Sequence, residues 1–502
     1  MLEHYFKKFR ENTIGAEQEF ETPYGIKQLL YADWTASGRL YKPIEQMISE
    51  DIGAFVGNTH SETSVTGSTM TNAYQNALSI IKEHVGAKNE DIILASNSGM
   101  TGLVNKFQRI LGFRIHEKYK NQITFSEEDK PVVFITHMEH HSNQVSWIET
   151  IADVVIIKST EEGFVDIENL NFLLETYKSR KTKIAAITSC SNVTGVFAPY
   201  HQIAEIMHEN GGLCFVDFAA SAPYININMH PEKEIQYLDA IYFSPHKFLG
   251  GPGSSGVLIF NKKLYTNTVP DAPGGGTVEW TNPWGEHKYL NNIEAREDGG
   301  TPAFLQTIKA ALSINLKKQM GVENILKREK AMMNKIWDGL IGIPNLHILA
   351  EKHKDRLGIF SFFIDNLHYN LIVNLLNDRF GIQVRSGCFC AGTYGHYLLN
   401  IDHDHSKSIT DKIDTGLFCD KPGWVRLSIH PILNNSEIDF IIDAIQQLCE
   451  NHLLWAKDYS YDLKTNNFKY TAKKYLNKNI VDDWFSRDLS EENPIVHIIN
   501  RK

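Results

Sequence analysis

Short apolar runs recur along the first half of the chain, and amphipathic segments separate them. Between residues 92 and 260 the runs are Ile92–Ala95, Val132–Thr136, Val154–Ile157, Ile184–Thr188, Leu213–Asp217, Ala240–Phe243 and Val257–Phe260. A strand that is buried on both faces of a parallel sheet is a continuous apolar run, whereas a helix between strands repeats at about 3.6 residues. The pattern predicts an α/β domain with a mostly parallel, seven-stranded sheet and helices on both faces.

A long helix is expected after the last of these strands. Thr301 followed by Pro302 is typical of a helix start, because proline is well tolerated at the first helical position. The helix is expected to continue to about Met320, with Gly321 as its stop.

The looser pattern beyond this helix predicts a smaller α+β domain. A strand is expected near Ile359–Ile364 and a helix near Tyr369–Asn377, whereas the polar stretch Gly395–Pro422 is expected to be an inserted loop. Ser436 and Glu437 are typical of a helix cap. The apolar face of the helix that follows consists of Ile438, Ile441, Ile445 and Leu448.

These changes of pattern divide the chain into four parts. Residues 1–45 are expected to be an N-terminal arm that joins the smaller domain, and residues 46–320 the large domain. Residues 321–456 are expected to form the small C-terminal domain. Residues 457–502, which are rich in Tyr, Asn, Lys and Asp, are expected to be an appendage.

The composition is that of a globular protein, with 42% hydrophobic and 22% charged residues among 502. The 50 basic and 60 acidic residues are scattered, which argues against a nucleic-acid partner. No apolar run approaches the roughly 18 residues of a membrane span, and the N-terminus lacks a secretory apolar stretch. Six cysteines are too few for a disulfide framework. We therefore expect a soluble cytoplasmic protein that binds neither nucleic acid nor membrane.

Two residues at predicted strand ends suggest cofactor chemistry. Lys247 follows a strand and precedes a glycine-rich segment, as a lysine that forms a Schiff base would, although a surface lysine beside a turn has the same pattern. Asp217 ends another strand, where ligands of open α/β sheets bind. An aspartate there can pair with a protonated ring nitrogen, or it can cap a helix.

Three further segments lie at strand ends. His140 can lie over a flat ring, and with His137 and His141 it also forms a candidate zinc site, which the absence of a nearby cysteine pair disfavours. The residues Ser98–Met100 precede a helix whose N-terminus can hold a phosphate. Asn192 offers an amide side chain, or it forms an Asx-type turn.

In combination these residues resemble the class V aminotransferase family of fold-type I pyridoxal 5'-phosphate (PLP) enzymes, especially the SUF-type cysteine desulfurases and selenocysteine lyases. The resemblance covers about residues 28–450. It rests on the order His140, Asn192, Asp217, Ser244-Pro245-His246-Lys247, Gly300-Thr301-Pro302, Arg385 to Cys390, and Arg426. It implies a fold-type I architecture, PLP as the cofactor, an amino acid as the substrate and a homodimer.

The resemblance also implies the residues that hold the cofactor. Lys247 would hold PLP as a Schiff base, His140 would stack on the ring, and Asp217 would pair with the pyridine nitrogen. Asn192 would lie beside the ring oxygen and the substrate. The residues of the implied phosphate site are Ser98, Gly99, Met100, Ser244, His246 and, from the neighbouring subunit, Thr301.

The implied substrate residues are Arg426, which would grip the substrate carboxylate, and Arg385. Cys390 matches the cysteine that forms a persulfide, so the implied catalytic residues are Lys247, Cys390 and His140. The leading hypothesis is a cysteine desulfurase that converts L-cysteine to L-alanine, with a sulfur-acceptor protein as a possible partner.

The chain departs from the desulfurase pattern at three points. Ala220 replaces a glutamine, Cys388 replaces a histidine, and the segment between Cys390 and Arg426 is longer than in those enzymes.

An aminotransferase or another α,β-lyase, in which the cysteine has no persulfide role, is the alternative activity. A second zinc hypothesis takes its ligands from Cys388, Cys390, His396 and Cys419. A non-catalytic scaffold of the same fold is the remaining alternative, and it gives no reason for Lys247 and Asp217 to occur together.

Overall fold

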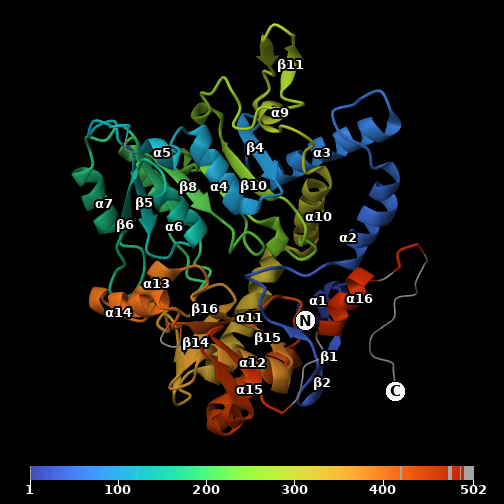
Figure 1. The fold of residues 1–502 in the computed structure, drawn as a ribbon, viewed down its shortest axis with the longest axis vertical. Coiled ribbons are helices and arrows are strands. Elements are labelled where there is room, and N and C mark those ends of the chain that lie inside the picture. The colour runs from blue at the N-terminus through green and yellow to red at the C-terminus, as the bar shows by residue number, and fades with distance from the viewer. Residues whose placement is uncertain (1, 121, 419–420, 473–477, 487, 491–502) are drawn as a thin grey trace.

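The computed structural model describes residues 2–120, 122–418, 421–472, 478–486 and 488–490. A large domain lies in the upper half of Figure 1 and a small domain, coloured orange and red, in the lower half. The N-terminal segment contains α1 (Leu2–Glu11), β3 (Leu30–Tyr31) and α2 (Lys42–Gln46). It reaches both domains, because β3 pairs with a strand of the small domain and α2 contacts a helix of the large one.

The large domain is built on a seven-stranded sheet of order β4-β10-β9-β8-β7-β5-β6. Its strands are β4 (Asp91–Ser96), β5 (Val132–Thr136), β6 (Asp153–Ile157), β7 (Lys183–Thr188), β8 (Leu213–Asp217), β9 (Ala240–Phe243) and β10 (Gly256–Asn261). Only β10 runs antiparallel to its two neighbours. All seven predicted strands are confirmed, each within one residue of its expected bounds.

The register of the parallel strands brings their carboxyl ends to one edge. Asp217 of β8 aligns with Thr188 of β7 on one side and with Tyr242 of β9 on the other. The loops that follow β7, β8 and β9 therefore begin at the same level, at the edge where open α/β sheets bind ligands.

Alternate residues of each strand pack on opposite faces of this sheet. Phe134 packs in the core beneath α3 (Val65–His84), α7 (Ile167–Thr176), α8 (Tyr200–Glu209) and α10 (Phe304–Met320). Its neighbour Val133 packs in the core beneath α4 (Gly99–Ile110) and α6 (His141–Ile148). Helices thus cover both faces, as the sequence predicts (Figure 1).

The predicted helix at residues 301–320 is present, but its start was placed too early. Helix α10 begins at Phe304 after Ala303, so Thr301 and Pro302 precede it. Gly300 has a positive φ of 86° and its N–H donates to Gly275 O at 2.9 Å, which holds this segment in the loop.

The small domain is built on an antiparallel sheet of order β13-β14-β17-β16, whose strands are β13 (Leu346–Ile348), β14 (Ile359–Ile364), β17 (Trp424–Ser428) and β16 (Arg385–Gly387). Its helices are α11 (Val322–Leu340), α12 (Tyr369–Phe380) and α15 (Asn435–Trp455). The predicted strand at 359–364 and the helix at 369–377 are confirmed. Next to this sheet, β15 (Ile382–Gln383) pairs in parallel with β3 of the N-terminal segment.

The cap of α15 lies two residues before the predicted one. Asn434, not Ser436, accepts the N–H of Glu437, and the Glu437 side chain accepts the N–H of Asn434 in return. The predicted apolar face of this helix is fully buried.

One expectation for the C-terminal region was wrong. The stretch expected as a loop forms α13 (Gly392–Leu398) and α14 (His403–Asp414), because Tyr394 and Gly395 are buried and Asp402 caps α14. In the tail, β18 (Tyr459–Asp462) and β19 (Asn467–Tyr470) form a hairpin whose Phe468 carbonyl accepts from Asn374 of α12 at 2.8 Å.

The remaining elements are short, and none of them adds a strand to the two main sheets. They are β1 (Glu19–Thr22), β2 (Gly25–Gln28), η1 (Met47–Ile52), η2 (Gly53–Phe55), α5 (Glu117–Lys120), η3 (Glu234–Gln236), η4 (Pro245–Lys247), η5 (Lys262–Leu264), β11 (Val278–Thr281), β12 (His287–Tyr289), α9 (Ile293–Glu297), η6 (Ala456–Asp458) and α16 (Lys478–Ser486). Among the described residues, no helix has the length and apolar character needed to cross a membrane.

Candidate active site

A cavity of about 250 Å³ lies where the carboxyl ends of the central strands meet the small domain. Its large-domain wall consists of His140, Asp217 and Lys247, and its small-domain wall of Arg385, Cys390 and Arg426. The other predicted site residues that line it are Met100, Asn192, Ser244 and His246. Residues from seven separate segments of the sequence therefore surround one space.

Lys247 ends the single turn η4, which directly follows β9. The turn is closely packed: a Cβ atom on Gly251 would lie 1.9 Å from the carbonyl oxygen of Pro245, so only glycine fits there. The amide of Gly38 also donates to His246 O at 2.9 Å. Burial lowers the pKa of Lys247 to about 8, and the charge of Asp217 opposes that shift.

Asp217 is buried at the end of β8, and its Oδ1 atom accepts the N–H of Ala219 at 2.7 Å. Burial raises the pKa of Asp217 to about 6, whereas the Ala219 N–H and the charge of Lys247 oppose that shift. A cationic group in the cavity would therefore favour the carboxylate form. Ala220, at the position where desulfurases have a glutamine, also lines the cavity.

His140 caps α6, and its Nδ1 atom accepts the N–H of Ser142 at 3.1 Å. In the neutral ring the proton therefore lies on Nε2. Burial, followed by the charge of Lys247, lowers the pKa of His140 to about 3, so the imidazole is neutral near pH 7. A neutral, flat ring on the cavity wall can stack on an aromatic cofactor.

Glu139, to which sequence reasoning gave no role, is buried behind the large-domain wall of the cavity and stabilises it. Its side chain is 1% exposed and accepts four hydrogen bonds: from Thr136 N–H, Thr136 Oγ1, Thr188 N–H and the Asn143 amide, at 2.5–3.2 Å. It thereby ties the end of β5 to the end of β7. The only signal in the sequence was an acidic residue directly after a buried apolar strand.

The predicted phosphate turn lies at the N-terminus of α4. Gly99 adopts a positive φ of 68°, and the opposite strand β10 approaches it so closely that a Cβ atom on Gly256 would lie 2.3 Å from Gly99 C. Met100 lines the cavity, whereas Ser98 lines a neighbouring one. The first N–H groups of a 12-residue helix therefore lie at the cavity edge.

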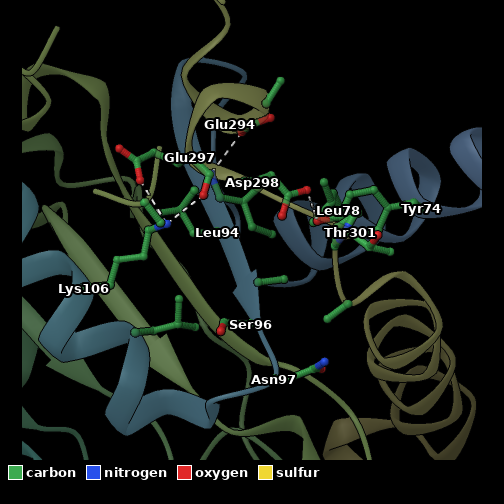
Figure 2. Close-up of a pocket in the computed structure, with 18 of the residues that line it drawn as sticks. Tyr74, Leu78, Leu94, Ser96, Asn97, Lys106, Glu294, Glu297, Asp298 and Thr301 are labelled. Atoms are coloured by element: carbon green, nitrogen blue, oxygen red, sulfur yellow. Dashed lines mark hydrogen bonds and ion pairs between the residues drawn. The ribbon is translucent and has the colours of Figure 1, made fainter. Parts of the chain in front are cut away.

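Thr301 does not line the cavity of Lys247. It lies in the neighbouring cavity of about 580 Å³, together with Tyr74 and Asp298, which hydrogen-bond to each other at 2.9 Å (Figure 2). Figure 2 also shows Lys106 paired with Glu297 in that cavity. The single chain therefore does not bring Thr301 into the cavity that contains Lys247, and Ser98 lines the same neighbouring cavity as Thr301.

On the small-domain wall, Arg385 of β16 is the register partner of Arg426 of β17. Arg426 is 3% exposed, and its Nη1 atom donates to Asn192 O at 3.0 Å. Both arginines form ion pairs with Asp33, which sequence reasoning did not single out. The signal that could have found Asp33 was weak, because an aspartate in an N-terminal segment is common.

Cys390 is exposed and lies in a strained loop, in which Phe389 and Cys390 have φ values of 51° and 55°. Large-domain residues hold this loop: His141 N–H donates to Cys390 O at 2.6 Å, and the Asn192 amide donates to Phe389 O at 3.0 Å. Cys388 is half-buried and packs against the core.

Neither zinc hypothesis gains support from the described residues, in which no three His, Cys, Asp or Glu side chains form a group that could hold a metal ion. His137, His140 and His141 are adjacent in sequence but do not form such a group. In the second hypothesis, Cys419 lies outside the described residues.

The family model for class V aminotransferases matches residues 30–441, most of the chain. The chain therefore belongs to the aminotransferase class-V family, and the predicted family is confirmed.

The chain is similar to named desulfurases. A probable cysteine desulfurase of Staphylococcus epidermidis is 28% identical over 371 residues, which cover 73% of this chain and 84% of the relative. A probable cysteine desulfurase of Halalkalibacterium halodurans is 28% identical over 369 residues, which cover 72% and 84% of the two chains.

Solved structures confirm the predicted fold class. The apo cysteine desulfurase of Thermococcus onnurineus NA1 has a TM-score of 0.71 at 21% identity, over 88% of this chain and 98% of that one. The cysteine desulfurase CsdA of Escherichia coli has a TM-score of 0.65 at 19% identity, over 84% and 94% of the two chains. At these identities the likeness concerns the fold alone.

Proposed function

We propose that this chain is a PLP-dependent cysteine desulfurase, which converts L-cysteine to L-alanine and leaves the sulfur as a persulfide on Cys390. The observation that carries the proposal is that Lys247, Asp217 and Cys390 line one cavity. The names of the relatives favour the same activity.

The residues present fit PLP. Lys247 would hold the cofactor covalently, His140 would cover one face of its ring, and Asp217 would pair with its pyridine nitrogen. The helix N-terminus at Gly99 and Met100, with Ser98, Ser244 and His246, would hold the phosphate. Asn192 supports this fit, because its buried Oδ1 atom has no hydrogen-bond partner among the described residues. When bound, PLP supplies an electron sink for a carbanion at the α-carbon.

Lys247 would also move the α-proton. A lysine whose pKa is lowered to about 8 has an appreciable neutral fraction near pH 7, and a neutral amine can accept a proton. Arg426, with Arg385, would hold the substrate carboxylate and so orient the α-hydrogen toward Lys247. The neutral ring of His140 would exclude water from the face of the cofactor ring that lies opposite Lys247.

Cys390 would be the sulfur acceptor. Its thiolate attacks the substrate sulfur, so that the bond between that sulfur and the β-carbon breaks and a sulfur–sulfur bond forms. The β-carbon gains a proton, and the products are L-alanine and the Cys390 persulfide. The exposure of Cys390 supports a later transfer of that sulfur to an acceptor protein.

We further propose a homodimer and the domain division at residues 45, 320 and 456. Thr301 lies outside the cavity of its own chain, and it would reach the phosphate of the partner subunit.

The test is a product analysis of the purified, PLP-loaded protein with L-cysteine and dithiothreitol. Sulfide and L-alanine are expected in equal amounts. Amino transfer to an α-keto acid at a rate above sulfide release would instead assign the chain to the aminotransferases. Uptake of PLP with neither reaction would overturn the desulfurase proposal.

A further inference from the structure

Asp33 joins the two arginines of the small-domain wall. Its Oδ1 atom pairs with Arg426 Nη2 at 2.8 Å, and its Oδ2 atom pairs with Arg385 Nε at 3.0 Å. Asp33 is only 8% exposed, so solvent weakly screens its pair with the buried Arg426, whereas its pair with the exposed Arg385 is screened more.

The segment around Asp33 is fixed to the small domain. Ser428 N–H donates to Ala32 O at 2.7 Å, and Thr35 N–H donates to the Ser428 hydroxyl at 2.9 Å. The Tyr31 hydroxyl donates to the carbonyl oxygen of Asp33 at 3.1 Å. These bonds on both sides fix the backbone of Asp33 beside β17, so its side chain starts from a fixed position next to the two arginines.

The two arginines differ in what they can still bind. Arg426 is almost fully buried, and its Nη atoms already donate to Asn192 O and Asp33. The side chain of Arg385 is 57% exposed, and among the described residues only its Nε atom has an acceptor. Two guanidinium charges and one carboxylate leave this wall with one net positive charge, which is enough for one substrate carboxylate. On the opposite wall Lys247 and Asp217 offset each other.

We propose that Asp33 sets the charge specificity of the site and restricts it to amino acids whose side chain carries no negative charge. This inference rests on the proposed function, in that the substrate is an amino acid. The α-carboxylate uses the single positive charge, and a second anionic group would find no further net positive charge on this wall, because Asp33 pairs with both guanidinium groups. Asp33 is a positioning residue, because it acts through Arg385 and Arg426.

The test compares the binding of L-alanine and L-aspartate to the PLP-loaded, full-length protein by calorimetry. The wild type should bind L-alanine more tightly. In Asp33→Asn the ratio of the two dissociation constants should shift toward L-aspartate by about tenfold or more, since each charge-assisted hydrogen bond is worth at least that factor. Asp33→Glu, which keeps the charge, should retain the preference of the wild type.

A structural role alone would weaken the binding of both amino acids together and leave their ratio unchanged, and that result would overturn the proposal. Asp458→Asn is the matched control: it removes a carboxylate that pairs with Arg379 at 3.0 Å in the same domain, but outside the cavity. In this variant the ratio of the dissociation constants for L-alanine and L-aspartate should equal that of the wild type.

A second variant keeps the inference testable if Asp33→Asn does not fold. Arg385→Gln leaves the wall neutral, so the preference for L-alanine over L-aspartate should increase, and a decrease would contradict the proposal. The two failures are distinguishable: a protein that takes up no PLP overturns the proposed function, whereas a PLP-loaded Asp33→Asn variant with the wild-type ratio overturns the inference about Asp33 alone.

Discussion

The two walls of the cavity are built in different ways. The large-domain wall consists of residues at, or within four residues of, the carboxyl ends of β5, β8 and β9, so the register of one sheet fixes their positions. The small-domain wall depends on contacts between distant segments, such as Arg426 with Asp33, which are 393 residues apart. In the function that we propose, the first wall holds the cofactor, and the second holds the substrate carboxylate and supplies Cys390. The register of a sheet edge fixes a whole set of residues at once, whereas the second wall depends on each of its separate contacts.

The largest effect should come from the large-domain wall. Lys247→Ala should abolish covalent attachment of PLP and lower the turnover of L-cysteine by about 10²–10⁴-fold or more, because the variant loses both the attachment point and the base. Borohydride reduction of the wild type, followed by peptide mass spectrometry, should find a pyridoxyl group on Lys247. Lys262→Ala, at an exposed lysine in the same domain, is the control and should remain active.

A pyridoxyl group on another lysine, or on none, would refute the role that we assign to Lys247.

The matching test of the small-domain wall is Cys390→Ala. It should abolish sulfide release from L-cysteine in the presence of dithiothreitol while PLP binding persists, because the thiol acts only after the substrate is bound. Cys388→Ala should reduce sulfide release much less, since Cys388 packs against the core and does not line the cavity. Cys449→Ala, in α15, is the control. If the Cys390 variant retains full desulfuration activity, Cys390 is not the sulfur acceptor.

Asp217→Asn tests the electrostatics of the large-domain wall. The neutral amide cannot keep a ring nitrogen protonated, so the variant should bind PLP but lose activity by about 10²–10³-fold, as when one stabilising group is removed from an active site. Absorbance spectra and sulfide assays measure the two properties separately. A variant that retains most of its turnover would mean that Asp217 does not face the ring.

The sequence predicts side chains of both walls, but it does not predict the contact that joins the two arginines of the second wall. Buried parallel strands have a distinctive apolar pattern, and residues at their carboxyl ends share one edge, so the pattern places Asp217 and Lys247 at that edge, whereas the roles that we give them come from the family resemblance. The role of Asp33 depends on a contact across the whole chain, which no local pattern encodes. Helix α14 was also missed, because only Ile409 of its residues is buried and the segment therefore has no apolar repeat.

Glu139→Gln tests the support beneath the first wall. Glutamine would place an amide N–H₂ group opposite the N–H₂ group of Asn143, so that two donors would face each other. The Asn143 side-chain amide cannot flip by 180° to present its oxygen instead, because that Oδ1 atom already accepts from Tyr242 and Trp147. One buried donor is left without an acceptor, so the free energy of unfolding should fall by about 1–3 kcal/mol. Urea unfolding measures this change, and Glu175→Gln on the surface is the control. If the urea concentration at the unfolding midpoint of Glu139→Gln equals that of the wild type, the hydrogen bonds of Glu139 do not stabilise the large-domain wall.

The corresponding support of the second wall is His430, which is buried and stacks on Trp34 of the N-terminal segment, with ring centroids 4.1 Å apart. Burial lowers the pKa of His430 to about 3, whereas in the unfolded chain the ring has its usual value near 6.5. Between these values the unfolded chain binds more protons than the folded one. The contribution of His430 to stability is therefore present above pH 6.5 and is lost as the pH falls, by about 1.4 kcal/mol for each pH unit.

Replacing His430 by Asn should remove this part of the pH dependence. The variant should be less stable than the wild type at pH 7, because the stack on Trp34 is lost, but its free energy of unfolding should fall less steeply between pH 6 and 5. Other buried histidines, among them His140 and His246, still contribute to the slope of both proteins, so the difference between the two slopes is the quantity to measure. His403→Asn, at an exposed histidine, should keep the slope of the wild type. Equal slopes for His430→Asn and the wild type would mean that His430 does not contribute to the pH dependence of stability, and the support that we assign to it would then be refuted.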